Sequence, residues 1–125
     1  MTENSKAGYG CLTIILFLLI AFKACDDDKP KKIEEMNSEA YIIAKEFMSK
    51  TLKAPSTAKF PSSEYKFIAS NKTNYCIIKS YVDAQNSFGA QIRTYYLVEL
   101  KWNEQDWADA NNWELIDLQT DENKF

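Results

Sequence analysis

Two acidic side chains, Asp83 and Glu99, are the strongest catalytic candidates in this chain of 125 residues. Both fall in segments that alternate apolar and polar residues, on the polar side, so we expect them to share one face of a β-sheet. Two carboxylates at a working distance can hydrolyse a bond by acid and base catalysis. The chain contains no histidine, which excludes Ser-His and Cys-His nucleophiles and imidazole zinc sites. A small carboxylate-dependent hydrolase is therefore the alternative function, and we favour a protein that is not an enzyme.

A second candidate site is a polar segment with three tryptophans, Trp102, Trp107 and Trp113. Exposed indole rings would form a ledge for a sugar or a peptide, whereas buried rings would close one end of a small core. The carboxylates between them suggest calcium, but the segment lacks the glycine and the bidentate glutamate of an EF-hand loop. A helical turn capped by Asn103 explains the same residues. We favour the core interpretation and expect no metal or cofactor.

Cys25 is a candidate for lipidation because it follows the apolar run of residues 11–22. The segment from Phe22 to Cys25 resembles a lipobox, and the aspartates after it resemble the acidic signal of surface lipoproteins in Bacteroides-like bacteria. Alternatively, residues 7–22 form an uncleaved signal-anchor helix of about 24 Å, somewhat short of a bilayer core of about 30 Å. Both interpretations stay open. Both attach the chain to a membrane through residues 7–25 and put the rest on the extracytoplasmic side.

The charge balance beyond this segment argues against nucleic-acid binding. The chain has 15 basic and 18 acidic residues, and residues 1–24 hold Lys6, Lys23 and Glu3, which leaves 13 basic and 17 acidic residues. A net charge of −4 offers no basic surface for phosphates.

The spacing of apolar residues predicts one helix after a charged tether of residues 26–32. From Met36 to Leu52 they recur every three or four positions, which is typical of an amphipathic helix. The helix begins either just after Pro30 or at a cap formed by Asn37 or Ser38.

Four segments with alternating polarity follow, and each predicts a β-strand: residues 65–69, 75–84, 91–102 and 113–118. The predicted fold is therefore α+β: an N-terminal membrane segment (residues 1–25), then one amphipathic helix packed on a four-stranded antiparallel meander sheet. We expect the domain to span residues 33–119 and to end in a polar tail, residues 120–125.

Two stretches resemble a known pattern: LKAPSTAKFP at residues 52–61 and YVDAQNSFGA at residues 81–90. They are similar to the stretches LKxPSxAxF and V(D/N)xxNS(F/Y)G(A/G) of an uncharacterised family of small bacterial and phage-associated exported, membrane-anchored domains. The resemblance implies a bacterial protein with an exported domain, and it implies no activity.

Within these stretches most residues have an expected structural role. Pro55 stops the helix and Phe60 plugs the edge of the sheet. Gly89 supplies a positive φ in a hairpin turn, and Asp83 and Arg93 flank that turn as a cross-strand ion pair.

The hairpin tip offers a functional alternative at Asn86, Ser87 and Phe88, because an aromatic side chain in a turn has little to pack against. The function that we expect is a membrane-tethered, non-catalytic envelope protein that binds an unidentified protein or ligand. Its binding surface would be this tip, the tryptophan segment or the sheet face that carries Tyr81 and Tyr95.

Overall fold

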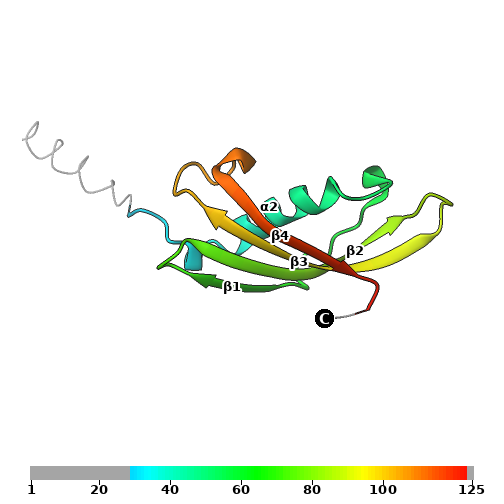
Figure 1. Cartoon of the computed structure of the whole chain (residues 1–125), viewed down its shortest axis with the longest axis horizontal. Helices are drawn as coiled ribbons and strands as arrows, with labels where there is room; N and C mark the ends of the chain where they lie inside the picture. Colours follow the sequence, from blue (N-terminus) through cyan, green and yellow to red (C-terminus); the bar gives the residue numbers. More distant parts are fainter. Residues whose placement is uncertain (1–28, 124–125) are drawn as a thin grey trace, which may run out of the picture. The chain divides into compact units, whose positions relative to one another are not determined.

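The computed structural model describes residues 29–123, in which one helix packs against one face of a four-stranded sheet (Figure 1). The helical elements are the 3-10 helix η1 (Ile33–Glu35), the α-helix α2 (Asn37–Ser49) and the 3-10 helices η2 (Pro55–Thr57) and η3 (Ala110–Asn112). The strands are β1 (Lys66–Ser70), β2 (Tyr75–Gln85), β3 (Gln91–Trp102) and β4 (Trp113–Asp121). They pair antiparallel in the order β1-β2-β3-β4, so the predicted α+β meander is confirmed for the described residues.

The helix α2 buries the apolar side that its spacing predicted, with Ala40, Ile43, Ala44 and Met48 all at most 1% exposed. The predicted cap by Asn37 or Ser38 is wrong, because neither side chain caps the first turn. Instead, the chain is fixed before the helix by burial: Ile33 in η1 and Met36 at the N-cap position are fully buried. Apolar packing thus replaces a polar cap at this helix start.

The strand predictions differ from the structure mainly at their ends. The segment 91–102 is β3 as predicted, whereas β4 runs on to Asp121. Thr120 and Asp121 pair with Tyr96 and Tyr95, so these two residues continue the sheet and do not belong to a polar tail. The extension depends on pairing with β3, which polarity alone does not show.

The core lies between α2 and the inner face of the sheet. Alternate residues of β2 and β3 are buried there, and the partly exposed residues between them point to the opposite side. We call that opposite side the outer face. Its members are Lys66, Ile68 and Ser70 of β1, Tyr75, Ile77, Lys79, Tyr81 and Asp83 of β2, Arg93, Tyr95, Leu97, Glu99 and Lys101 of β3, and Glu114, Asp117, Gln119 and Asp121 of β4.

The chain enters the domain at one end of the sheet. Glu34 in η1 and Asn71 in the β1–β2 turn exchange two hydrogen bonds, in which each backbone N–H donates to the other's side-chain oxygen at 3.2 and 3.3 Å. The β2–β3 hairpin turns at the other end of β2, roughly 34 Å away at about 3.4 Å per residue. The two ends of the sheet therefore carry different parts of the molecule (Figure 1).

None of the helices among residues 29–123 is long and apolar enough to cross a membrane. The predicted anchor, residues 7–25 with Cys25, lies outside the described residues.

Candidate functional site

The β2–β3 hairpin ends in a loop, residues 86–90, whose shape is held by the side chain of Asn86. Its Oδ1 atom accepts hydrogen bonds from the backbone N–H groups of Phe88 and Ala90, both at 3.0 Å. Gly89 has a φ of +79°, as the sequence predicted, and its N–H donates to the carbonyl of Asn86 at 3.1 Å. Asn86 is therefore a structural residue that rigidifies the turn.

Phe88 lies at this tip and is 95% exposed. The neighbouring Ser87 is also exposed. Since the ring does not fold back onto the sheet, Phe88 contributes nothing to the core. The tip thus presents one large apolar side chain to its surroundings on a turn of defined shape.

The hairpin is braced next to its loop by Thr57, the last residue of η2, and by Lys59 after it. Thr57 Oγ1 accepts a hydrogen bond from the backbone N–H of Gln85 at 2.9 Å. Lys59 and Asp83 exchange two backbone hydrogen bonds, at 2.7 and 3.0 Å, and form an isolated bridge. The two stretches that the sequence singled out are therefore in contact, and the first one supports the second.

The helix α2 ends at Ser49, earlier than its apolar spacing predicted, so Pro55 is not what stops it. Pro55 is the first residue of η2, beyond the end of α2. Phe60 packs edge-to-face against the ring of Tyr96, with 6.3 Å between the ring centroids. Together they direct the chain from the helix to the free edge of β2.

Asp83 and Arg93 form the predicted cross-strand ion pair on the outer face. The guanidinium donates two hydrogen bonds to the carboxylate, both of 2.8 Å, and lies 4.0 Å from the centroid of the Tyr81 ring. The hydrogen bonds from Arg93 hold the pKa of Asp83 below its ordinary value. The Tyr81 hydroxyl in turn donates to Glu64 at 2.7 Å, so this side of the hairpin is fixed by polar contacts.

The tryptophan segment is part of the core, which removes it as an exposed ledge. Trp102 and Trp113 are 6% and 4% exposed and stack with their ring centroids 5.9 Å apart. Each indole N–H donates to a backbone carbonyl, that of Gln105 or of Trp107. Trp107 itself is partly buried against the same cluster. The interpretation that we favoured from the sequence therefore accounts for these rings.

The expected helical turn capped by Asn103 is wrong. Asn103 Oδ1 accepts from the N–H of Gln105 in an Asx turn, and Glu104 takes a positive φ of 66°. The short helix of this segment is η3, which comes later and is capped by the side chain of Asp109. Local side-chain hydrogen bonds thus compete successfully with a helix here.

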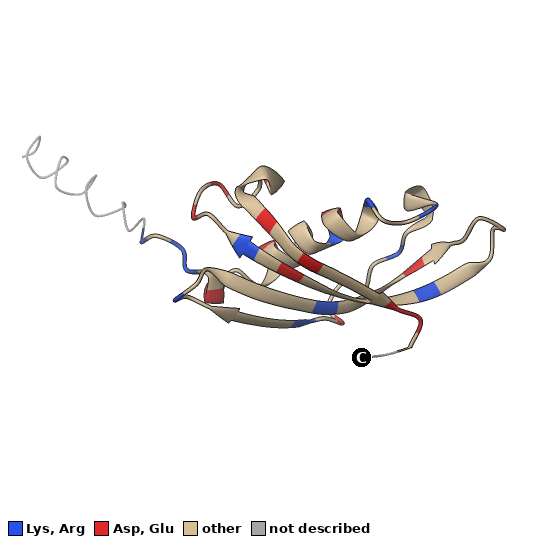
Figure 2. Ribbon diagram, in the orientation of Figure 1, with Lys and Arg blue, Asp and Glu red and all other residues tan. Residues whose placement is uncertain are grey.

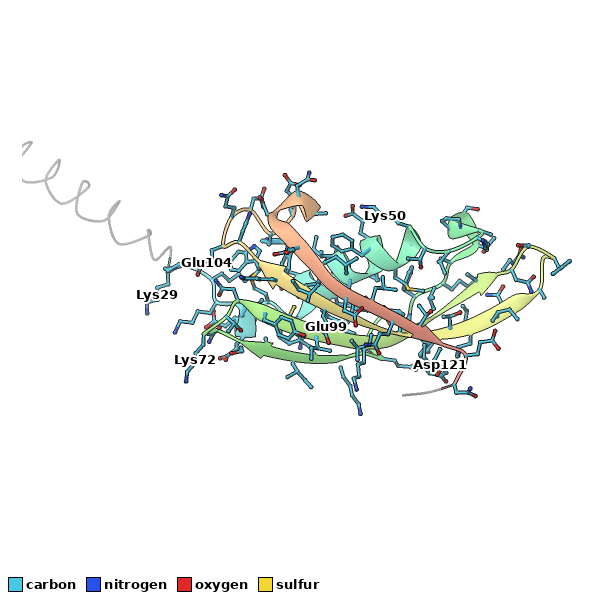
Figure 3. The ribbon with its side chains drawn as sticks, viewed as in Figure 1. Lys29, Lys50, Lys72, Glu99, Glu104 and Asp121 are labelled. Carbon is cyan, nitrogen blue, oxygen red and sulfur yellow. The ribbon has the colours of Figure 1, made fainter. Side chains whose placement is uncertain are left out.

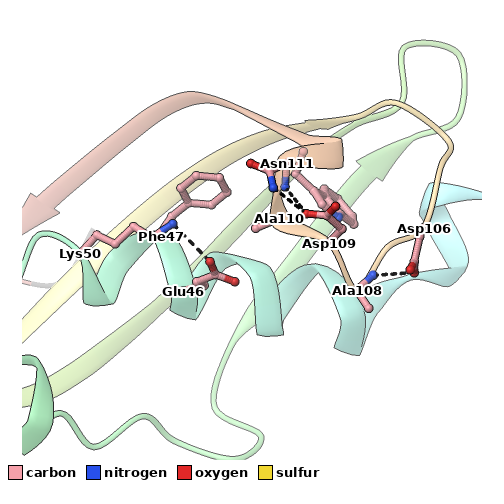
Figure 4. Close-up of a pocket in the computed structure, with 9 residues that line it drawn as sticks. Glu46, Phe47, Lys50, Asp106, Ala108, Asp109, Ala110 and Asn111 are labelled. Atoms are coloured by element: carbon pink, nitrogen blue, oxygen red, sulfur yellow. Dashed lines mark hydrogen bonds and ion pairs between the residues drawn. The ribbon is translucent and has the colours of Figure 1, made fainter.

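A hollow of about 780 Å³ lies between α2 and this segment (Figure 4). Its polar groups are mostly engaged: Glu46 pairs with Lys50 at 3.2 Å, and one oxygen each of Asp106 and Asp109 accepts a backbone N–H. The carboxylates of this hollow therefore act as caps and surface ion pairs.

Asp83 and Glu99 do not form a catalytic pair. Glu99 lies opposite Ile77 in the β2–β3 ladder, six positions from Asp83 along β2. At about 3.4 Å per residue, the two positions are roughly 20 Å apart, well beyond the separation that glycosidase carboxylates use. Each is also engaged, since Arg93 binds Asp83 and the hydroxyl of Tyr75 donates to Glu99. This hydrogen bond raises the pKa of Tyr75 to about 12.

The sequence alone did not indicate the brace or the arrangement of the outer face. Thr57 and Lys59 contact residues more than twenty positions away, which no local spacing reveals. The only sequence signal was the hydroxyl of Thr57 after Pro55 and Ser56. It indicated a hydrogen bond to some backbone group, but it did not indicate that Gln85 would be the donor.

No protein-family model matches the sequence, and no curated protein or solved structure gives a match. The family resemblance of the two stretches thus stays a prediction, and the functional argument rests on the geometry.

Proposed function

We infer that this chain is a membrane-tethered, non-catalytic protein of the bacterial envelope that binds a partner with the tip of its β2–β3 hairpin. The observation that carries this inference is the 95% exposure of Phe88 on a turn locked by Asn86. Loops that a rigid scaffold positions often carry binding residues.

The hairpin is suited to binding because it is ordered before it meets a partner. Asn86 fixes the turn, and Thr57 and Lys59 brace β2 next to it. A preorganised loop loses little conformational entropy on binding. Burying a phenylalanine ring in an apolar pocket stabilises a complex by about 1.5–3 kcal/mol. Phe88 therefore has the properties of an anchor residue for a small contact.

The direction of the tip supports the tethered arrangement. The chain enters the domain beside the β1–β2 turn, and Phe88 lies at the opposite end of β2 and β3. A partner that contacts Phe88 therefore meets the end of the domain remote from the chain entry. The anchor itself, residues 7–25, is proposed from the sequence.

The binding proposal is tested with the full-length protein from its native membrane. Partners are cross-linked in the cell, recovered with a C-terminal affinity tag and quantified for the wild type, Phe88→Ala and the matched control Ser87→Ala. We expect Phe88→Ala to reduce recovery at least about tenfold, the effect of a lost anchor residue. Its free energy of unfolding should stay within about 0.5 kcal/mol of the wild type. Equal recovery with all three proteins would contradict the proposal.

The tether is tested separately with Cys25→Ser. An uncleaved signal-anchor helix predicts that this variant stays in the membrane fraction, whereas lipidation predicts its release or a block in processing. Mass spectrometry of the purified wild type distinguishes the two, because a lipoprotein begins at a modified Cys25. A wild-type protein recovered only in the water-soluble fraction would contradict both forms of the tether.

A further inference from the structure

No helix or strand among residues 29–123 covers the outer face of the sheet. The helix α2 packs on the inner face, and Ile68 on the outer face is 61% exposed. Ile77, Leu97 and the edge-to-face pair Tyr81–Tyr95 are only partly buried beside it. The middle of this face is therefore apolar and aromatic, as in surfaces that pack against a partner.

Charge divides this face into two halves (Figure 2). Leaving aside the internal pair Asp83–Arg93, the strands β1 and β2 contribute two lysines and no carboxylate. The strands β3 and β4 contribute Lys101 and the carboxylates Glu99, Glu114, Asp117 and Asp121. Figure 3 labels Glu99 on β3 and Asp121 at the end of β4. Glu64, just before β1, adds one carboxylate beside Tyr81, so the half formed by β1 and β2 has a small positive charge and the half formed by β3 and β4 is acidic.

Like charges also lie directly opposite each other within each half. Lys66 pairs with Lys79 across β1 and β2, and Glu99 pairs with Asp117 across β3 and β4. None of these four side chains forms an ion pair with another residue of the described domain. Like charges opposite one another destabilise a sheet. Each pair lacks the counter-charge that would offset this repulsion in the isolated domain.

We propose that the outer face is the contact surface of a symmetric homodimer, in which the basic half of one copy faces the acidic half of the other. Two faces that meet around a twofold axis share an identical patch. An axis parallel to the strands exchanges the two halves, so the row of Lys66 and Lys79 meets the row of Leu97 and Gln119 of the other copy. Asp117 and Asp121 then lie one step along the strand to either side, about 7 Å away, within reach of a lysine side chain. An axis across the strands would set lysines against lysines. Charge therefore selects the parallel axis.

The same axis also fits a tether, and this second argument rests on the function proposed above. A twofold axis along the strands leaves both β1–β2 turns at one end and both hairpin tips at the other. The two chains then enter their domains from the same side, as attachment to a single membrane requires. Both Phe88 side chains point to the opposite side. An axis across the strands would place the chain entries at opposite ends.

The size of the face suits a reversible dimer. The four strands hold 5, 11, 12 and 9 residues. At about 3.4 Å per residue and 4.8 Å between strands, they cover on the order of 600 Å² per copy, or 1,200 Å² in total. Stable interfaces begin at about 1,200 Å². Attachment to a membrane would raise the effective concentration of the copies and favour this contact.

The test uses the full-length protein in detergent micelles and measures its dimer dissociation constant by sedimentation. One variant reverses the basic half (Lys66→Glu with Lys79→Glu), and another reverses the acidic half (Asp117→Lys with Asp121→Lys). We expect the wild type to dimerise and each variant alone to dimerise at least about tenfold more weakly, since like charges then meet. An equimolar mixture of the two variants should dimerise again, because their halves are complementary. Ile42→Ala, at an exposed position on α2, is the matched control and should not change the dissociation constant.

Two results would overturn the proposal: a wild type that stays monomeric up to its solubility limit, or a dimer that persists unchanged in both reversal variants. The second result would assign the dimer to another part of the chain or to an axis across the strands. Thermal melts verify that each variant is folded. Should a glutamate variant unfold, Lys66→Gln with Lys79→Gln provides the same test with a smaller expected loss. Because Phe88 takes no part in this contact, failure of the dimer and failure of partner binding are separate outcomes.

Discussion

Two buried tyrosines should respond in opposite ways to the loss of a hydroxyl group. Tyr96 is fully buried, and its hydroxyl makes no hydrogen bond of good geometry among the described residues, although the hydroxyls of Tyr41 and Ser80 lie near it. Tyr41 is 3% exposed, stacks on Tyr65 at 3.9 Å and donates a hydrogen bond of 2.6 Å to the carbonyl of Pro61. The substitutions Tyr96→Phe and Tyr41→Phe remove the same atom from two neighbouring positions, of which only that of Tyr41 has a well-formed hydrogen bond.

The expected magnitudes follow from the cost of burying a polar group. An unsatisfied buried hydroxyl costs about 1–3 kcal/mol, so Tyr96→Phe should stabilise the domain by about 1 kcal/mol once the small vacated volume is counted. Tyr41→Phe should destabilise it by about 1 kcal/mol, because a satisfied hydrogen bond is lost and the Pro61 carbonyl is left without its donor. In a domain of this size, 1 kcal/mol shifts the melting temperature by about 4–8 °C.

Thermal and denaturant unfolding of both variants and the wild type, each as the fragment 29–125, measure this contrast. The decisive quantity is the difference between the two tyrosine variants, because it cancels errors shared by both melts. If Tyr96→Phe lowers the melting temperature as much as Tyr41→Phe does, the Tyr96 hydroxyl has a partner, such as an ordered water molecule. The reasoning would then be refuted.

Three further predictions concern the helix, the turn and the ion pair. Phe47→Ala should lower the free energy of unfolding by about 2–3 kcal/mol. This is less than the roughly 3–5 kcal/mol of a fully buried phenylalanine, because the ring is only partly buried. Unfolding by urea measures the loss, and a loss near zero would contradict packing of Phe47 against the core. Gly89→Val should lower the free energy of unfolding by about 1–3 kcal/mol. The loss comes from the positive φ alone, since no atom lies within 4 Å of a Cβ placed there. Gly89→Asn should lower it less, because asparagine tolerates a positive φ better than valine does. Arg93 lowers the pKa of Asp83, so the ion pair stabilises the domain at neutral pH. This stabilisation is lost as the pH falls through the lowered pKa, below about 4. The difference in melting temperature between the wild type and Asp83→Asn should therefore vanish in acid.

The elements of this fold could be predicted because their polarity patterns are strong. The strict alternation in β2 and β3 indicated both strands and their buried sides. The helix start could not be predicted, because it depends on burial of Ile33 and Met36 by distant residues. The last residues of β4 are polar, and they are in a strand because β3 offers them partners.

The candidate site could be predicted only in part. A glycine after a polar turn segment correctly indicated a hairpin at Gly89, and the nearly matching distances of Asp83 and Arg93 from the turn indicated their ion pair. The proposed pairing of Asp83 with Glu99 failed because a shared sheet face says nothing of distance along the strands. The charge division of the outer face needs the register of all four strands, which the sequence does not provide.

The β2–β3 hairpin also has a consequence for the order in which this domain folds. Its two strands are joined in eleven register pairs, from Gln85 with Gln91 to Tyr75 with Lys101, around a loop of only five residues. Closing so short a loop costs little entropy, so this ladder can form before contacts between distant segments. The bridge between Lys59 and Asp83 closes a longer loop, so we expect it to form after this ladder. The turn at Asn86 would then set the folding rate, and the segment that braces it would mainly set the rate of unfolding.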